Sequence, residues 1–95
     1  SVYVKVKNVN QKISRQITLN AYSENSPTKE SLPVYLDTQP THIDTLEPET
    51  EKIYRIDVSN LKGKVIFEMN QKMGSSGIRT LKNSKNPSLV ELHIK

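Results

Sequence analysis

Apolar residues recur at every second position in several short stretches of this chain, which is the period of a β-strand with one buried face. In the first stretch Val2, Val4 and Val6 alternate with Tyr3, Lys5 and Lys7. Between these stretches lie clusters of Asn, Ser, Pro, Gly and Thr, the residues that favour turns. The pattern predicts eight strands, at residues 1–7, 13–22, 32–37, 42–46, 52–58, 64–69, 78–81 and 89–94.

The alternation also predicts which side chains are buried. The inward positions hold mainly Val, Ile, Leu and a single Phe, and Arg15 is the one misfit in its strand. Only 34% of the residues are hydrophobic, so we expect a thin core. The predicted inward residues are Val2, Val4, Val6, Ile13, Ile17, Leu19, Ala21, Tyr54, Ile56, Val58, Val65, Phe67, Met69, Val90, Leu92 and Ile94.

The connections between the predicted strands are too short for the crossovers that parallel strands require, so mainly antiparallel sheets are expected. Strands with one polar face stack as two sheets around a common core. The fold class predicted for residues 1–95 is therefore a single all-β domain, an antiparallel β-sandwich of seven or eight strands. An immunoglobulin-like or a jelly-roll topology fits this pattern, and a small barrel is the alternative.

Charge is distributed unevenly along the chain. Residues 1–23 carry a net charge of +4, residues 24–57 carry −5 and residues 58–95 carry +5. Lysines beside tyrosines suit contact with polyanions such as nucleic acid, teichoic acid or anionic glycans. A solvated face, protection of sheet edges or contact with another protein are the alternatives. The candidate polyanion contacts are Lys5, Lys7, Lys62, Lys64, Lys72, Arg79, Lys82 and Lys85.

A metal site is conceivable at His42 and Asp44, which lie two residues apart and so share a strand face. Zinc or iron would need a third ligand, such as Asp37 or His93, brought close by the fold. An ordinary polar surface pair is the competing interpretation. The chain has no cysteine, which excludes thiolate nucleophiles, thiolate ligands and disulfides. We therefore predict no catalytic, cofactor-binding or metal residues.

Two loops carry residues that could bind a ligand. Glu47, Glu49 and Glu51 alternate around a proline and could offer oxygens to calcium, although calcium loops usually mix Asp, Asn and Gly. The segment MGSSG at 73–77 contains two glycines, yet it lacks the Gly-Lys-Ser/Thr ending and the helix of a phosphate-binding loop. Both loops are predicted to be ordinary turns, the second joining two antiparallel strands.

The segments VYVKVKNVNQKISRQITLNAY (2–22) and LEPETEKIYRIDV (46–58) resemble the pattern of bacterial immunoglobulin-like accessory modules. In those modules an Asn closes the first strand, and a leucine, a turn and an acidic-polar stretch lead into an alternating strand. The sequence departs from the pattern at Glu49, where the modules usually carry Gly. The resemblance implies a surface or secreted protein with a non-catalytic binding or spacer role, and it transfers no site residues.

These observations lead to the expectation of a non-catalytic binding, adhesion or spacer module of a bacterial secreted or surface protein. It would recognise a protein or a glycan and needs no cofactor. A polyanion-binding β domain is the alternative, and a small metal-dependent enzyme is the second alternative. Specific nucleic-acid reading is not expected, because no recognition helix is predicted and arginines are few. No apolar run approaches the length of a membrane span.

Overall fold

The computed structural model describes residues 2–58, 63–71, 77–82 and 88–95, and within these ranges the chain is all-β. Each of the eight predicted strands has a counterpart. No helix in this described part of the chain could cross a lipid bilayer. The strands are β1 (Val2–Asn8), β2 (Arg15–Ser23), β3 (Val34–Leu36), β4 (Gln39–Pro40), β5 (Ile43–Leu46), β6 (Glu51–Ile56), β7 (Lys64–Gln71), β8 (Gly77–Lys82) and β9 (Ser88–Ile94).

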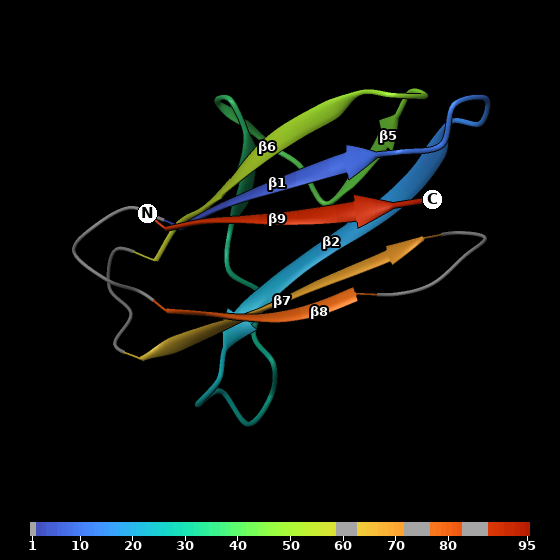
Figure 1. Cartoon of the computed structure of the whole chain (residues 1–95). Helices are drawn as coiled ribbons and strands as arrows, with labels where there is room; N and C mark the ends of the chain where they lie inside the picture. The colour runs from blue at the N-terminus through green and yellow to red at the C-terminus, as the bar shows by residue number, and fades with distance from the viewer. Residues whose placement is uncertain (1, 59–62, 72–76, 83–87) are drawn as a thin grey trace.

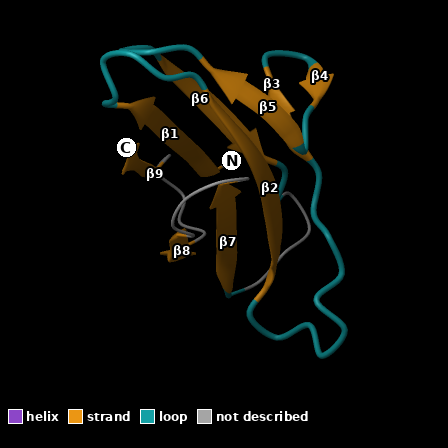
Figure 2. Ribbon diagram, turned by 90° about the vertical axis from the view of Figure 1, so that its right-hand side faces the viewer, coloured by secondary structure: helices purple, strands orange, loops and turns teal. Residues whose placement is uncertain are grey.

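The strands form two sheets, which lie one over the other in Figures 1 and 2. One sheet has five strands in the order β4-β3-β6-β1-β9, and the other has four in the order β5-β2-β7-β8. Neighbouring strands pair antiparallel with one exception, the parallel pair of β1 and β9. These two strands can pair in parallel because nearly the whole chain lies between them, so no short connection has to cross over.

The core lies between the sheets, where the predicted alternation places it. Val2, Val4 and Val6 are buried in β1, and Tyr54 and Ile56 are buried in β6 of the same sheet. The facing sheet contributes a second set, and both sets belong to one apolar cluster, which gives a sandwich-like packing. The buried members from the facing sheet are Ile17, Leu19, Ala21, Leu46, Val65, Phe67 and Met69.

The prediction that Ile13 is an inward residue of a strand is wrong. Strand β2 begins at Arg15, and Ile13 is 49% exposed. The cause is local, because the side-chain Oδ1 of Asn10 accepts hydrogen bonds from the backbone N–H groups of Lys12 (2.8 Å) and Ile13 (2.9 Å). These bonds hold the chain in a loop through Ile13, so the strand with alternating buried residues begins only at Arg15.

Residues 38–41 were expected to be a turn, but Gln39 and Pro40 form the short strand β4. The turn is limited to Asp37 and Thr38, and the φ of Asp37, 56°, is in the left-handed region that Asp tolerates better than most residues. Strand β4 pairs with β3 at the edge of the sheet. An edge strand accommodates Pro40 because its missing N–H can face solvent.

Asn8 joins the loops at one end of the sandwich. It ends β1 and is completely buried, the single buried polar residue among the side chains that the structure describes. Its Nδ2 group donates to the backbone carbonyls of Ile13 (2.9 Å) and Leu46 (3.0 Å), and it lies 3.3 Å from the carbonyl of Glu47. Its Oδ1 accepts from the N–H of Asn10 (3.0 Å). One side chain therefore connects the loops after β1 and after β5.

Candidate functional site

The outward side chains of β1 and β6 form a surface rich in cations and aromatic rings. The two strands pair antiparallel, which places Tyr3 beside Arg55 and Lys5 beside Ile53. These residues alternate with the buried ones, so they lie on the solvent side of the five-stranded sheet. We call this surface the basic-aromatic face and define it as Tyr3, Lys5, Lys7, Tyr35, Ile53 and Arg55.

Arg55 lies at the centre of the arginine and tyrosine part of this face. Its guanidinium carbon is 4.6 Å from the centroid of the Tyr35 ring, which is stacking distance. Tyr35 in β3 and Tyr3 in β1 are its register partners on either side. Arg55 thus lies between two strands that each carry a tyrosine, and its stacking on Tyr35 restricts part of the motion of the guanidinium before any ligand arrives.

Acidic residues partly neutralise the rest of the face. The Lys5 ammonium is 3.9 Å from a carboxylate oxygen of Glu51, a partly exposed pair that contributes little to stability. In β9, Glu91 lies opposite Lys5 in register, and its carboxylate is 3.2 Å from His93 Nε2. The three cations Lys5, Lys7 and Arg55 set against the two carboxylates Glu51 and Glu91 leave a net charge of +1, with histidine neutral.

The predicted polyanion contacts are divided between the two sheets. Lys5 and Lys7 lie in β1 of the five-stranded sheet, whereas Lys64 is exposed in β7 of the four-stranded sheet. By register, Lys64 lies opposite Lys82 of β8, the strand that also contains Arg79. The described members of the set therefore do not share one sheet. Lys62, Lys72 and Lys85 lie outside the described residues.

Sequence reasoning did not single out Tyr35, Ile53 and Arg55 as parts of a binding face. The alternation of residues 52–58 does place Ile53 and Arg55 on the side opposite the buried Tyr54 and Ile56, so their outward position could be predicted from the sequence. The pairing of β6 with both β1 and β3 could not be predicted, because it joins segments that are distant in the sequence.

The structure does not bring His42 and Asp44 together with a third ligand. His42 precedes β5, and its Nδ1 is 3.2 Å from the carbonyl oxygen of Leu19. His93 is exposed and contacts Glu91, and Asp37 is exposed in the turn between β3 and β4. Within the described ranges, no three His, Cys, Asp or Glu side chains are grouped as metal ligands would be.

Asp44 instead connects the two sheets at an edge of the sandwich. Its carboxylate accepts hydrogen bonds from the Lys52 ammonium (3.1 Å) and from the buried Tyr54 hydroxyl (2.8 Å), both in β6. Lys52 also donates to the carbonyl oxygen of Thr45 in β5 (3.1 Å). The strand β5 belongs to the other sheet, so this polar cluster connects the two layers where the apolar core ends.

The pKa values of the cluster follow from these contacts. Burial pushes the pKa of the Asp44 carboxyl upward, but hydrogen bonds from Tyr54, Lys52 and its own neighbour's N–H, together with the Lys52 charge, outweigh burial and lower it. Burial is also the main cause of a strongly raised pKa for Tyr54, to which the hydrogen bond and charge of Asp44 add. The cluster therefore holds an ionised carboxylate beside a neutral phenol.

Among the described residues, the three candidate calcium ligands Glu47, Glu49 and Glu51 do not form a metal-binding group. Glu47 accepts a hydrogen bond from the Ser14 hydroxyl (2.7 Å), and Glu51 faces Lys5 at the start of β6. Glu49 has a φ of 59°, in the left-handed region. The carboxylates of Glu47 and Glu51 are thus directed to separate cations or donors.

The glycine-serine segment at 73–77 lies outside the described residues, except for Gly77 at the start of β8. The strands on its two sides, β7 and β8, pair antiparallel, with Met69 opposite Gly77. That pairing is the arrangement in which the segment was predicted to act as a turn.

Comparison of the chain with models of known protein families, with curated proteins and with solved structures gives no match.

Proposed function

We propose that this chain is a non-catalytic binding or adhesion module of a bacterial secreted or surface protein, and that it holds an anionic polymer on its basic-aromatic face. The observation that carries the proposal is the register of β1 and β6, which aligns Tyr3, Lys5 and Lys7 with Arg55 and Ile53 on one solvent-facing surface. The stacking of Arg55 on Tyr35 extends this surface by one strand.

The spacing of the cations suits a linear ligand. Lys5 and Lys7 lie on the same side of one strand, where successive side chains are about 7 Å apart along the strand. Their ammonium groups can therefore meet charges that repeat along an extended chain. Arg55 offers a flat, forked donor for a phosphate, sulfate or carboxylate, and the tyrosine rings offer apolar area to the parts of the polymer between its charges. The net charge of +1 favours modest affinity.

An immunoglobulin-like topology in the broad sense belongs to the same proposal. Apart from the hairpin of β3 and β4, the strands divide into layers of three and four, as in constant-type immunoglobulin domains. The first two strands share a sheet in those domains, whereas β1 and β2 lie in different sheets here. The resemblance to bacterial accessory modules gains support from Asn8, which closes β1 with a buried amide. It also gains support from Glu49, whose left-handed backbone occupies the position of their glycine.

The test measures retention on immobilised heparin and on polyphosphate as a function of salt concentration. The variant is Lys5→Gln with Lys7→Gln, and the matched control is Lys12→Gln with Lys29→Gln, which removes the same charge from exposed positions outside the basic-aromatic face. We expect wild-type retention to fall steeply with salt. The variant should lower the slope of log K against log salt by about 0.7–0.9 for each lost contact, whereas the control should not.

Equal effects of the two double variants would mean that only total charge matters, and the face would not be the binding site. Absence of wild-type retention at low salt would remove the polyanion from the proposal. The module would then act as a spacer or bind a ligand of another class.

A further inference from the structure

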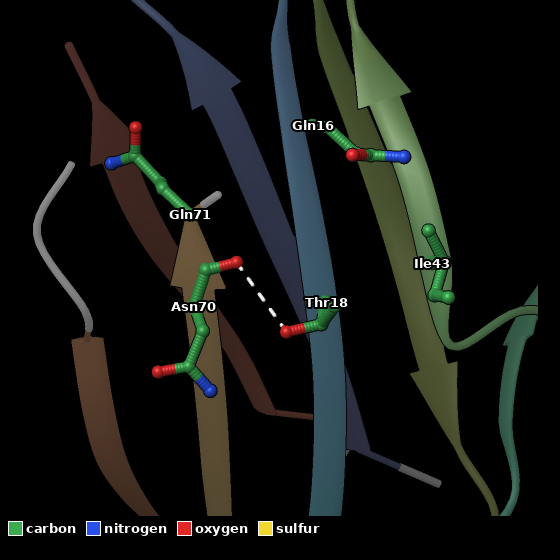
Figure 3. A pocket seen from close by; sticks show the side chains of 5 residues that line it. All are labelled: Gln16, Thr18, Ile43, Asn70 and Gln71. Atoms are coloured by element: carbon green, nitrogen blue, oxygen red, sulfur yellow. Dashed lines mark hydrogen bonds between the residues drawn. The ribbon is translucent and has the colours of Figure 1, made fainter. Parts of the chain in front are cut away.

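A shallow groove crosses the outer surface of the four-stranded sheet, on the side of the molecule opposite the basic-aromatic face. Figure 3 shows the five lining residues on three adjacent strands. The groove has a volume of about 190 Å³. Its lining consists of Gln16 and Thr18 from β2, Ile43 from β5, and Asn70 and Gln71 from β7.

The lining residues are uncharged, their surface in the groove is mainly apolar, and a few polar groups among them are available. Gln16 and Asn70 are exposed, and their side-chain amides make no hydrogen bond to another residue in the part of the chain that the structure describes. The Thr18 hydroxyl has only a long bond, 3.5 Å, to the backbone carbonyl of Asn70, drawn as the dashed line in Figure 3. Ile43 is 63% exposed and forms the apolar wall beside these groups.

We propose that this groove binds a neutral oligosaccharide. A sugar hydroxyl both donates and accepts hydrogen bonds, and the amides of Gln16 and Asn70 and the hydroxyl of Thr18 can do the same. The C–H face of a sugar ring can cover Ile43, whose exposed area is otherwise in contact with water. Because the lining residues carry no charge, a charged ligand would gain no ionic contact from them. The site is independent of the polyanion face, since it lies on the other sheet.

A peptide strand fits the groove less well than a sugar chain. Peptides that bind to β-sheets usually add to an open edge and pair with its backbone groups. The groove instead crosses the faces of β5, β2 and β7, and it offers side chains rather than an edge. The nearest edge strand is β5, and the carbonyl oxygen of its Thr45 already accepts a hydrogen bond from Lys52 at 3.1 Å.

The experiment is a titration of isotope-labelled protein with cellohexaose and with chitohexaose, followed by the chemical shifts of the backbone amides. We expect shift changes at the groove residues, with dissociation constants of roughly millimolar order. The double variant Gln16→Ala with Asn70→Ala should bind about tenfold more weakly or worse, because two side-chain amides are lost. Gln11→Ala with Gln39→Ala is the matched control, since both side-chain amides are exposed and neither residue lines the groove.

The variant with Lys5→Gln and Lys7→Gln should bind the sugars normally, which separates this proposal from the polyanion site. Dispersed spectra of all variants establish that each one is folded. The proposal is overturned if neither hexasaccharide shifts the groove resonances at about 10 mM. It is also overturned if the shifts appear around Arg55, or if a short uncharged peptide shifts the groove resonances and the sugars do not.

Discussion

Replacement of Asn8 by alanine is expected to destabilise the fold strongly, although the change removes only a small side chain. Asn8 is completely buried, and its amide donates to the carbonyls of Ile13 and Leu46 while its oxygen accepts from the N–H of Asn10. Alanine leaves all three backbone groups without this partner. The loops after β1 and after β5 lose the side chain that joins them.

The magnitude follows from how far water can reach each orphaned group. The bond to Leu46 is buried, and a buried group that loses its partner costs about 1–3 kcal/mol. The bonds to Ile13 and Asn10 are only partly buried, so each should cost about 0.5–1 kcal/mol. The total is about 2–5 kcal/mol, a large share of the 5–15 kcal/mol by which a domain is typically stable. The melting temperature should fall by roughly 10–40 °C.

The assay is chemical and thermal unfolding followed by circular dichroism, with Thr45→Ala as an exposed control that should change stability by less than about 0.5 kcal/mol. Asn8→Asp provides a second, pH-dependent test, because its carboxylate would face the carbonyls of Ile13 and Leu46. Those carbonyls should raise the folded-state pKa of the new carboxyl. The variant should therefore be most stable below about pH 4 and lose stability as pH rises through the raised folded-state value. A loss below 1 kcal/mol in Asn8→Ala, or a pH-independent Asn8→Asp, would refute the reasoning.

Two further predictions concern the backbone and the sheet-to-sheet cluster. Glu49→Gly should stabilise the protein by about 0.5–1 kcal/mol. Glycine removes the left-handed backbone strain at φ 59°, and this gain is larger than the cost of the higher conformational entropy of the unfolded chain. A lowered melting temperature would contradict this prediction. The pKa of Asp44 is lowered in the folded state, so its contribution to stability is present above about pH 4 and is lost as pH falls through the folded value. Tyr54→Phe should reduce that acid dependence, and urea unfolding at a series of pH values measures it.

The strands were predictable from the sequence because each depends on a local alternation. In an extended backbone, alternate residues lie on the same side, as Val2, Val4 and Val6 do in β1 and Val65, Phe67 and Met69 do in β7. Because these side chains are apolar, the hydrophobic effect favours burial of that side. The wrong prediction for Ile13 also has a local cause. The hydrogen bond from the N–H of Ile13 to the side chain of Asn10 holds this residue in a loop, although its position fits the alternating pattern.

The site was less predictable because it depends on which strands become neighbours. Lys5 and Lys7 were identifiable as outward residues, but their position beside β6, with Arg55 and Tyr35, follows from pairings between distant segments. His42 and Asp44 were predicted to be an ordinary polar surface pair, with a metal site as the alternative, because their spacing was the only information available. The actual partners of Asp44, which are Lys52 and Tyr54, lie in the other sheet, and no local pattern specifies which sheet a strand joins.

The parallel pairing of β1 with β9 determines how the molecule would carry tension. Val2 is opposite Ser88 and Asn8 is opposite Ile94, so the start of β1 and the end of β9 lie at opposite ends of the pair, as Figure 1 shows. A pull applied to the two ends acts along the strands. Their interstrand hydrogen bonds are then loaded together in shear rather than opened one after another, and the weakest bond does not set the strength of the whole.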